Sequence, residues 1–126
     1  MNIYVLNAVS AGLDTVQALG DQISIAGFIG LAPSKNKNVS GYISMADYAK
    51  KRELPYYEAQ SYSLDDSRDR EALLRLNIDF LLVVGWQRLV PEWLIAHTRH
   101  AVFGSHGSPF GITQNLGTPR GQQYRL

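Results

Sequence analysis

A histidine within a turn of small residues is the side chain of this sequence best suited to chemistry. The stretch "AVFGSHGSPFG" (residues 101–111) runs from an apolar segment into a glycine- and serine-rich turn that carries His106. A neutral imidazole donates and accepts hydrogen bonds, so His106 could polarise a carbonyl or stabilise an oxyanion. The alternative is a loop histidine that bonds only to nearby backbone. Composition favours this alternative, whereas a position at the end of a strand favours the functional interpretation.

A second stretch, "VVGWQRLVP" (residues 83–91), could hold a flat heterocycle. Trp86 offers a planar ring and Arg88 a planar cation, while Leu89 and Val90 offer an apolar wall. Backbone groups of such a loop could read the edge of a bound ring. The alternative is that Trp86 packs beneath the loop and that Arg88 is solvated, and local reasoning slightly favours it.

The first loop, "NAVSAGLD" (residues 7–14), could hold an anion at the start of a helix through Ser10 and Gly12. It lacks both the dinucleotide fingerprint G-x-G-x-x-G and the phosphate loop G-x-x-x-x-G-K-[ST], so an ordinary helix cap is the simpler interpretation. His97 and His100 are interpreted as residues at a helix end, where the macrodipole favours a positive charge. No carboxylates lie near them in ligand spacing, so we expect no metal site.

Composition indicates one globular domain spanning residues 1–126. The sequence is 45% hydrophobic and 18% charged, with a net charge of +1 and no cysteine, which excludes disulfide and thiolate chemistry. The balanced charge does not favour a nucleic-acid partner for this chain alone. No apolar run approaches the roughly 20 residues of a membrane helix, and the start lacks the basic region of a signal peptide. We therefore expect a cytoplasmic protein without a membrane partner.

The elements that must position these loops alternate along the chain. Apolar periodicity and the punctuation by glycine, proline and capping residues predict strands over 3–8, 23–30, 56–60, 78–86 and 100–106, and helices over 10–20, 44–54, 63–77 and 90–99. Such alternation predicts an α/β fold, a Rossmann-like, open, mainly parallel sheet with helices on both faces. Ligands of such sheets sit beyond the carboxyl ends of the strands, where the three loops described above would meet.

Details of two elements are also expected. The most apolar strand, 78–86, reads as a central strand covered on both faces. Asp66 or Ser67 should cap the helix within 63–77, and Pro91 should occupy the first position of the next helix. The charged runs "YAKKREL" (48–54) and "DDSRDRE" (65–71) are interpreted as solvated helix faces.

Several stretches resemble the folate-dependent formyltransferases, which include methionyl-tRNA formyltransferase, glycinamide ribonucleotide formyltransferase and the sugar N-formyltransferases. They are "IDFLLVVGWQRLVPEWLI" (78–95), "AVFGSHGSPFG" (101–111) and "GTPRGQ" (117–122). The opening "MNIYVLNAVSAGLDTVQAL" (1–19) and "YAKKRELPYYEAQSYSLDD" (48–66) are similar to further family segments. The resemblance covers nearly the whole chain but about half of a typical family enzyme, and the histidine turn is its most specific part.

The resemblance implies that His106 is catalytic. In the family, a histidine in a motif such as Asn-x-His-Pro helps to stabilise the tetrahedral intermediate formed when an amine attacks the formyl group of 10-formyltetrahydrofolate. The asparagine position falls on Gly104, so Ser105, Ser108 or backbone groups would have to replace its amide. Loss of one such donor costs about 10²–10³ in rate.

The resemblance also assigns the donor pocket and the substrates. The family segment that lines the pterin pocket falls on Trp86, Gln87, Arg88, Leu89 and Val90, whereas Ser10, Gly12, Ser105 and Ser108 would contact the amine substrate. The formyl donor would be 10-formyltetrahydrofolate. A nucleotide-linked amino sugar is favoured over methionyl-tRNA as the acceptor, because the sequences "GWQRLVP" and "GSHGSP" are more similar to the sugar N-formyltransferases.

One expected catalytic residue is missing. The family carries an aspartate well downstream of its histidine, and no aspartate follows His106 in this sequence. The stretch "GTPRGQQYRL" (117–126) also diverges from the Gly-Arg-Gly-Arg-x-Pro continuation of the family. We therefore expect a truncated N-terminal domain without full activity. The alternative is a non-catalytic folate- or nucleotide-binding remnant, or a regulatory partner of an intact enzyme.

An unpaired last strand would have a further consequence. A sheet that ended at the strand over 101–105 would expose one row of backbone donors and acceptors. We therefore expect self-association of the chain into a homo-oligomer through this region.

Overall fold

The computed structural model describes residues 1–37 and 39–104, which alternate between strands and helices. The strands are β1 (Ile3–Asn7), β2 (Ile25–Leu31), β3 (Tyr56–Ala59), β4 (Phe80–Gly85) and β5 (Ala101–Gly104). The helices are α1 (Ser10–Leu19), α2 (Ala46–Arg52), α3 (Ser67–Leu74) and α4 (Glu92–His97), with short 3₁₀ turns at Gly20–Gln22 and Pro33–Lys35. Every strand and helix expected before residue 105 is present, with boundaries shifted by a few residues.

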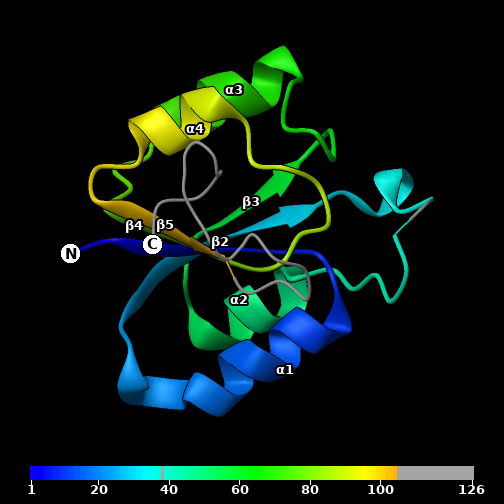
Figure 1. The fold of residues 1–126 in the computed structure, drawn as a ribbon. Helices are drawn as coiled ribbons and strands as arrows, with labels where there is room; N and C mark the ends of the chain where they lie inside the picture. The colour runs from blue at the N-terminus through cyan, green and yellow to red at the C-terminus, as the bar shows by residue number, and fades with distance from the viewer. Residues whose placement is uncertain (38, 105–126) are drawn as a thin grey trace.

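The five strands form one parallel sheet in the order β3-β2-β1-β4-β5 (Figure 1). The chain builds outward from β1 to β2 and β3, and then returns to the other side of β1 to add β4 and β5. The order therefore reverses between β1 and β4, and this reversal is the place where open α/β sheets bind ligands. The prediction of a Rossmann-like α/β fold is confirmed.

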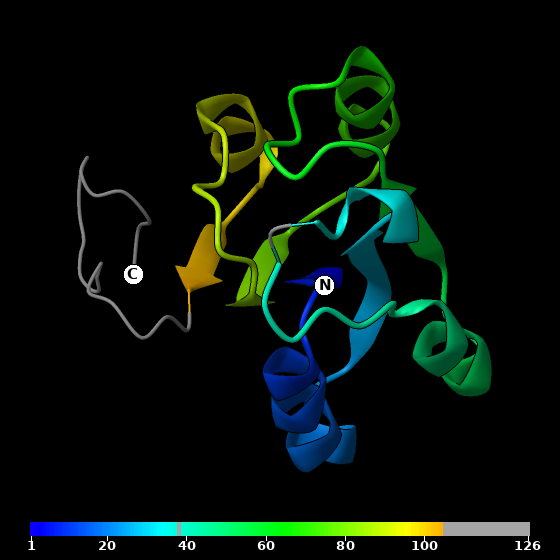
Figure 2. The same ribbon diagram turned by 90° about the vertical axis from the view of Figure 1, so that its right-hand side faces the viewer.

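Helices cover both faces of this sheet. Figure 2 looks along the strands and shows α1 and α2 on one side of the sheet, with α3 and α4 on the other. Successive right-handed crossovers explain this placement, because reversing the direction of building moves the connecting helices to the opposite face. None of the helices in residues 1–37 and 39–104 is long and apolar enough to cross a membrane.

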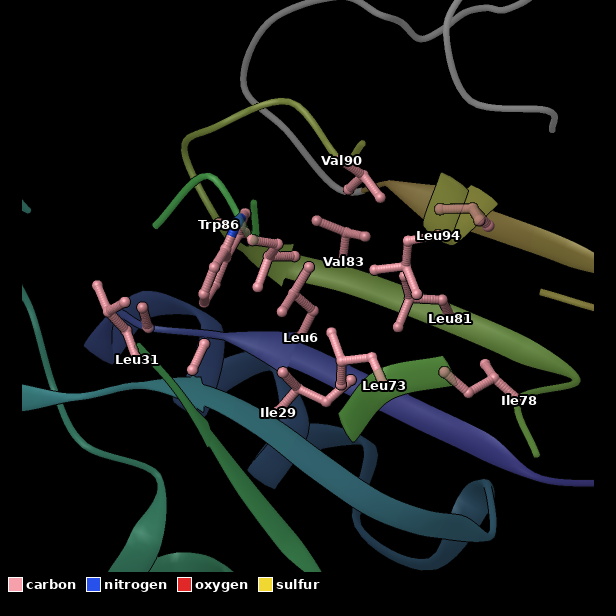
Figure 3. Close-up of a cluster of buried hydrophobic side chains, with 14 of the residues drawn as sticks. Leu6, Ile29, Leu31, Leu73, Ile78, Leu81, Val83, Trp86, Val90 and Leu94 are labelled. Carbon is pink, nitrogen blue, oxygen red and sulfur yellow. The ribbon is translucent and has the colours of Figure 1, made fainter. Parts of the chain in front are cut away.

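Two clusters of buried side chains fill the interfaces between the helices and the two faces of the sheet. The larger one packs Leu6, Ile29 and Leu81 of the strands against Leu73 of α3 and Leu94 of α4 (Figure 3). The smaller one lies on the α1 and α2 side and consists of Val5, Val16, Ile25, Phe28, Met45 and Ala49. Neighbours such as Val5 and Leu6 enter opposite clusters because successive side chains of a strand point to opposite faces.

The prediction that the 78–86 strand is covered on both faces is only half right. Leu81 and Val83 are buried on the α3 and α4 side, whereas Leu82 and Val84 on the other side are half-buried. On the same side, Phe103 of β5 lies opposite Leu82 and is 42% exposed. Within the described residues, this face of the sheet is covered more fully over β1 and β2, where Val5 and Phe28 are buried, than over β4 and β5.

The expected helix starts are close to the observed ones. Asp66 is the cap of α3, because its side chain accepts a hydrogen bond from the backbone N–H of Arg68 at 2.8 Å. Pro91 is extended and precedes α4, which begins one residue later than expected, at Glu92. The carbonyl of Pro91 accepts from Leu94 at 3.0 Å, so proline still starts the helix from just outside it.

Candidate functional site

The ends of β1 and β4 meet at the point where the strand order reverses. The N–H of Ala8 donates to the carbonyl of Gly85 at 2.9 Å, so the "NAVSAG" and "GWQRLVP" loops leave the sheet side by side. Asn7 is fully buried here. Its Oδ1 accepts from the N–H of Val9 at 3.2 Å and its Nδ2 donates to the carbonyl of Val9 at 3.0 Å. This local ring fixes the direction in which the first loop leaves β1.

Two glycines make room for the Asn7 side chain. A Cβ on Gly12 would lie 1.9 Å from Oδ1 of Asn7, and a Cβ on Gly85 would lie 2.0 Å from the same atom. Any larger residue at either position would displace the asparagine. Gly12 therefore has a packing role. Its sequence context pointed to the start of a helix and gave no sign of this role.

The backbone amides that could have bound an anion at the start of α1 are largely used by the fold itself. The N–H of Ser10 donates to the carbonyl of Gly41 at 2.9 Å, and that of Gly12 donates to the carbonyl of Val9 at 3.1 Å. The segment that carries Gly41 continues past the end of β1, where the N–H of Ile43 donates to the carbonyl of Ala8 at 2.9 Å. Ser10 is exposed, so its hydroxyl rather than its amide is the group it can offer to a ligand.

The segment 86–90 is anchored at both ends and exposed between them. Trp86 is 2% exposed and Val90 is 6% exposed, and both belong to the larger buried cluster (Figure 3). The three residues between them, Gln87, Arg88 and Leu89, are exposed. The alternative interpretation of this loop, with Trp86 packed beneath it and Arg88 solvated, therefore matches the observed burial. The surface that the segment offers to a ligand is its tip and its backbone, not the face of the indole.

Tyr62, which follows β3, packs against this segment. Its hydroxyl accepts a hydrogen bond from the N–H of Gln87 at 2.8 Å, and its ring packs edge-on against Trp86 with centroids 4.9 Å apart. The guanidinium of Arg88 lies 5.4 Å from the centroid of the same ring. Burial raises the pKa of Tyr62, while the Gln87 amide and the Arg88 charge oppose the rise. Sequence reasoning did not single out Tyr62, because nothing in its neighbourhood signals a contact 25 residues away.

The loop that carries Tyr62 is held by the carboxylate of Asp69 in α3. Asp69 is fully buried, and it accepts hydrogen bonds from the Tyr57 hydroxyl at 2.6 Å and the Gln60 N–H at 2.8 Å. It also accepts from the N–H and the hydroxyl of Ser61, at 2.9 and 2.6 Å. Four donors thereby replace the water that a buried carboxylate would otherwise need.

The prediction of a solvated "DDSRDRE" face is therefore wrong at Asp69. A signal was available, because Asp69 precedes the buried Leu73 by four residues and so shares its face of the helix. The partner Tyr57 is affected in turn. Burial, and then its hydrogen bond to Asp69, raise the pKa of the Tyr57 hydroxyl far above its ordinary value.

One buried polar atom at this edge has no partner among residues 1–37 and 39–104. The indole Nε1 of Trp86 makes no hydrogen bond to any of the described residues, although it is shielded from solvent. Leaving a buried donor unpaired costs about 1–3 kcal/mol. The surroundings of Trp86, rather than its own hydrogen bonding, must therefore hold the ring in place.

The stretch that carries His106 follows β5. The last residue of β5, Gly104, pairs with Val83 near the carboxyl end of β4. His106, Ser105 and Ser108 lie outside the described residues.

The other two histidines lie near the opposite end of the sheet. His97 is the last residue of α4, as expected, and a ring nitrogen lies 2.8 Å from the carbonyl of Leu76. His100 lies beyond the helix with its ring 5.3 Å from that of Phe80. Within residues 1–37 and 39–104 no group of three histidines or carboxylates could hold a metal ion.

Comparison with known proteins adds no assignment. The chain matches no protein-family model, and it matches no curated protein at a significant level. Any statement about function therefore depends on the residues themselves and on the geometry of this edge.

Proposed function

We propose that the chain is a formyltransferase-like domain that binds 10-formyltetrahydrofolate and directs its formyl group to an amine. The observation that carries the proposal is the meeting of the β1–α1 loop and the 86–90 segment at the reversal of strand order. The sequence stretches that resemble the folate-dependent formyltransferases include both of these loops. An amino sugar nucleotide is the favoured acceptor, ahead of methionyl-tRNA.

The residues at the edge suit a folate. Residues 87–89 are exposed, and their backbone groups other than the Gln87 N–H, which bonds to Tyr62, could pair with the donors and acceptors of a pterin. Leu89, which is 71% exposed, supplies apolar area beside them. Arg88 is exposed and forms no ion pair with the described residues, so its guanidinium is available to a carboxylate of the folate tail. Trp86 and Val90 contribute by anchoring this surface. The bound folate would supply the one-carbon unit.

His106 would act on the formyl carbonyl. Its imidazole would donate a hydrogen bond to the carbonyl oxygen and help to manage the proton of the attacking amine. Ser105 and Ser108 supply hydroxyl groups on either side of the histidine in the sequence, and the Ser10 hydroxyl is exposed at the start of α1. We propose these three serines as contacts of the amine substrate.

Calorimetric titration with 5-formyltetrahydrofolate, a stable analogue of the donor, tests the proposal. We expect saturable binding with a micromolar Kd. The Leu89→Asp variant should bind about tenfold or more weakly, because its new carboxylate would lose hydration beside the pterin ring of the ligand. Leu74→Asp on α3 is the matched control, since Leu74 is also an exposed leucine, at 43%, but lies outside the edge loops. Absence of binding at millimolar ligand would overturn the assignment of a folate site.

A second candidate is binding without catalysis, as a folate- or nucleotide-binding module or a regulatory partner of an intact enzyme. It is favoured by one observation, namely that Gly104 stands where the resemblance places the asparagine of the family, so that side-chain amide is missing. A formyl-transfer assay with 10-formyltetrahydrofolate separates the two. Transfer that disappears in His106→Ala supports the enzyme, whereas folate binding without transfer in the wild type supports the binding module.

Self-association and location complete the proposal. β5 is paired only with β4 among the described strands, and Phe103 on it is 42% exposed, which supports contact between two copies along this edge. The absence of cysteine fits a reducing compartment, and we propose a cytoplasmic location.

A further inference from the structure

We propose that Tyr62 is a positioning residue for ligand binding, which sets the backbone of the 86–88 segment while being held in place by the buried Asp69 carboxylate. The inference deepens the proposed function, because it rests on the 86–90 segment being the folate-binding loop. It assigns a role to a residue that lies outside that segment and that need not touch the ligand.

Tyr62 contacts three consecutive residues in three different ways. Its hydroxyl accepts from the N–H of Gln87 at 2.8 Å, its ring packs edge-on against Trp86, and its ring face lies under the Arg88 guanidinium. A single side chain therefore fixes a backbone amide, a buried ring and an exposed cation. Gln87 and Arg88 belong to the exposed tip, and Trp86 anchors its start.

The segment needs this outside support. Gln87, Arg88 and Leu89 are exposed, so little apolar burial holds the tip in one conformation. Among the described residues, the indole N–H of Trp86 has no hydrogen-bond partner that would anchor it. Without Tyr62, the Gln87 amide could bond to water as readily as to protein, and the tip would sample several conformations.

Tyr62 is itself rigidly placed. The preceding residue, Ser61, donates two hydrogen bonds to Asp69, and its hydroxyl accepts from the N–H of Asp66 at 3.1 Å. Two residues after Tyr62, the fully buried Leu64 has a φ of 65°, in the left-handed region that costs a non-glycine residue roughly 1–2 kcal/mol. A loop that sustains this strain is held by its surroundings in one conformation. The conformation it maintains is the one that presents Tyr62 to the 86–88 segment.

The experiment replaces Tyr62 by phenylalanine, which keeps the ring and its contacts but removes the acceptor. We expect amide hydrogen exchange at Gln87 to accelerate about tenfold, which corresponds to the loss of one hydrogen bond. The Kd for 5-formyltetrahydrofolate should rise by a similar factor. Because the Gln87 amide can bond to water instead, the thermal unfolding temperature should change little, and this separates positioning from a general loss of stability.

Tyr42→Phe is the matched control. The Tyr42 hydroxyl donates to the carbonyl of Leu31 at 2.5 Å at the same edge of the sheet, but it makes no hydrogen bond to the 86–88 segment. We expect it to leave both Gln87 exchange and the Kd at the wild-type values. A second variant, Ser61→Ala, weakens the attachment of the Tyr62 loop to Asp69 without changing Tyr62, and should accelerate Gln87 exchange to a smaller extent.

The outcomes are distinct. Unchanged Gln87 exchange in Tyr62→Phe overturns the inference. Accelerated exchange with an unchanged Kd also overturns it, because Tyr62 would then order the segment without affecting ligand binding. If the wild type binds no folate, the proposed function fails. In that case the exchange of Gln87 still decides whether Tyr62 orders the segment.

Discussion

Asn7 of β1 and Gly85 of β4 lie so close together that a methyl group on the glycine would meet Oδ1 of the asparagine at 2.0 Å. Both residues end their strands, and the asparagine uses the same oxygen to accept from the N–H of Val9. The contact therefore fixes, at one point, where the first loop leaves the sheet and where the 86–90 segment begins.

Gly85→Ala should destabilise the protein by about 3 kcal/mol, because a buried side chain and backbone would have to move apart. Gly41→Ala is the control. Gly41 has a φ of 75°, and a methyl group there would meet only Oγ of Ser10, at 3.9 Å, so only backbone strain of about 1 kcal/mol is expected. Chemical denaturation measures both values. Equal losses for the two variants would show that the space around Asn7 does not govern the effect.

Asp69→Asn should cost about 3 kcal/mol in the free energy of unfolding. The amide nitrogen of asparagine is a donor, so it would face donors that the carboxylate oxygen now accepts from. Asp65→Asn, an exposed change in the neighbouring loop, should shift the same free energy by less than about 0.5 kcal/mol. A small effect at Asp69 would contradict the view that its carboxylate organises the loop after β3.

The Asp66 carboxylate should titrate far below its usual pH. Hydrogen bonds from the Arg68 side chain and then from its N–H lower the pKa of Asp66 from 3.8 to about 2. The folded pKa is below the unfolded one, so the associated stability is present above about pH 4 and is lost as the pH falls towards 2. Carbon-detected NMR titration of the Asp66 carboxyl measures the pKa directly. Arg68→Gln should raise that pKa towards 3.8, and an unchanged value would refute the assigned cause.

Ionisation of the Tyr56 hydroxyl should lower the free energy of unfolding at alkaline pH. Burial is the largest cause that raises the pKa of Tyr56 from 10.0 to about 12, with Ser44 opposing and Glu58 reinforcing the rise. The folded pKa is above the unfolded one, so stability is complete below pH 10 and declines as the pH rises from 10 to 12. The free energy of unfolding measured across this range should decline less in Tyr56→Phe than in the wild type. Parallel declines in the two proteins would exclude Tyr56 as a contributor.

Phe103→Lys should weaken self-association. The substitution places a charge on the outer strand of the described sheet, where a second copy would otherwise pair and cover the ring. Leu74→Lys is the control, since Leu74 is exposed to nearly the same extent, 43% against 42%, but lies on α3. Sedimentation velocity over a range of concentrations measures the effect. A wild type that stays monomeric at high concentration would refute the proposed association.

The strand and helix order could be predicted because each element carries its own local signal. Residues 3–8 and 78–86 are apolar and β-branched, and glycine or proline punctuates most of the segments. The two loops at the reversal of strand order could be located for the same reason, since they follow the two strands that the pattern marks most clearly.

The contacts within the candidate site could not be predicted, because they join residues distant in the sequence. The spacing of Asp69 to Leu73 indicates that Asp69 is buried, but nothing local identifies its four donors, and Tyr62 has no local feature that points to Gln87. Trp86 could be placed from local reasoning, which slightly favoured a ring packed beneath the loop over a ligand platform. Trp86 is 2% exposed and belongs to the larger buried cluster, in agreement with that interpretation.

The burial of Trp86 and Val90 on either side of an exposed tip has an evolutionary consequence. Substitutions at positions 87–89 would leave the core untouched, so this short stretch could diversify while the scaffold stayed constant. Relatives that handle different ligands would then be expected to vary at these three positions and to retain bulky apolar residues at both flanks.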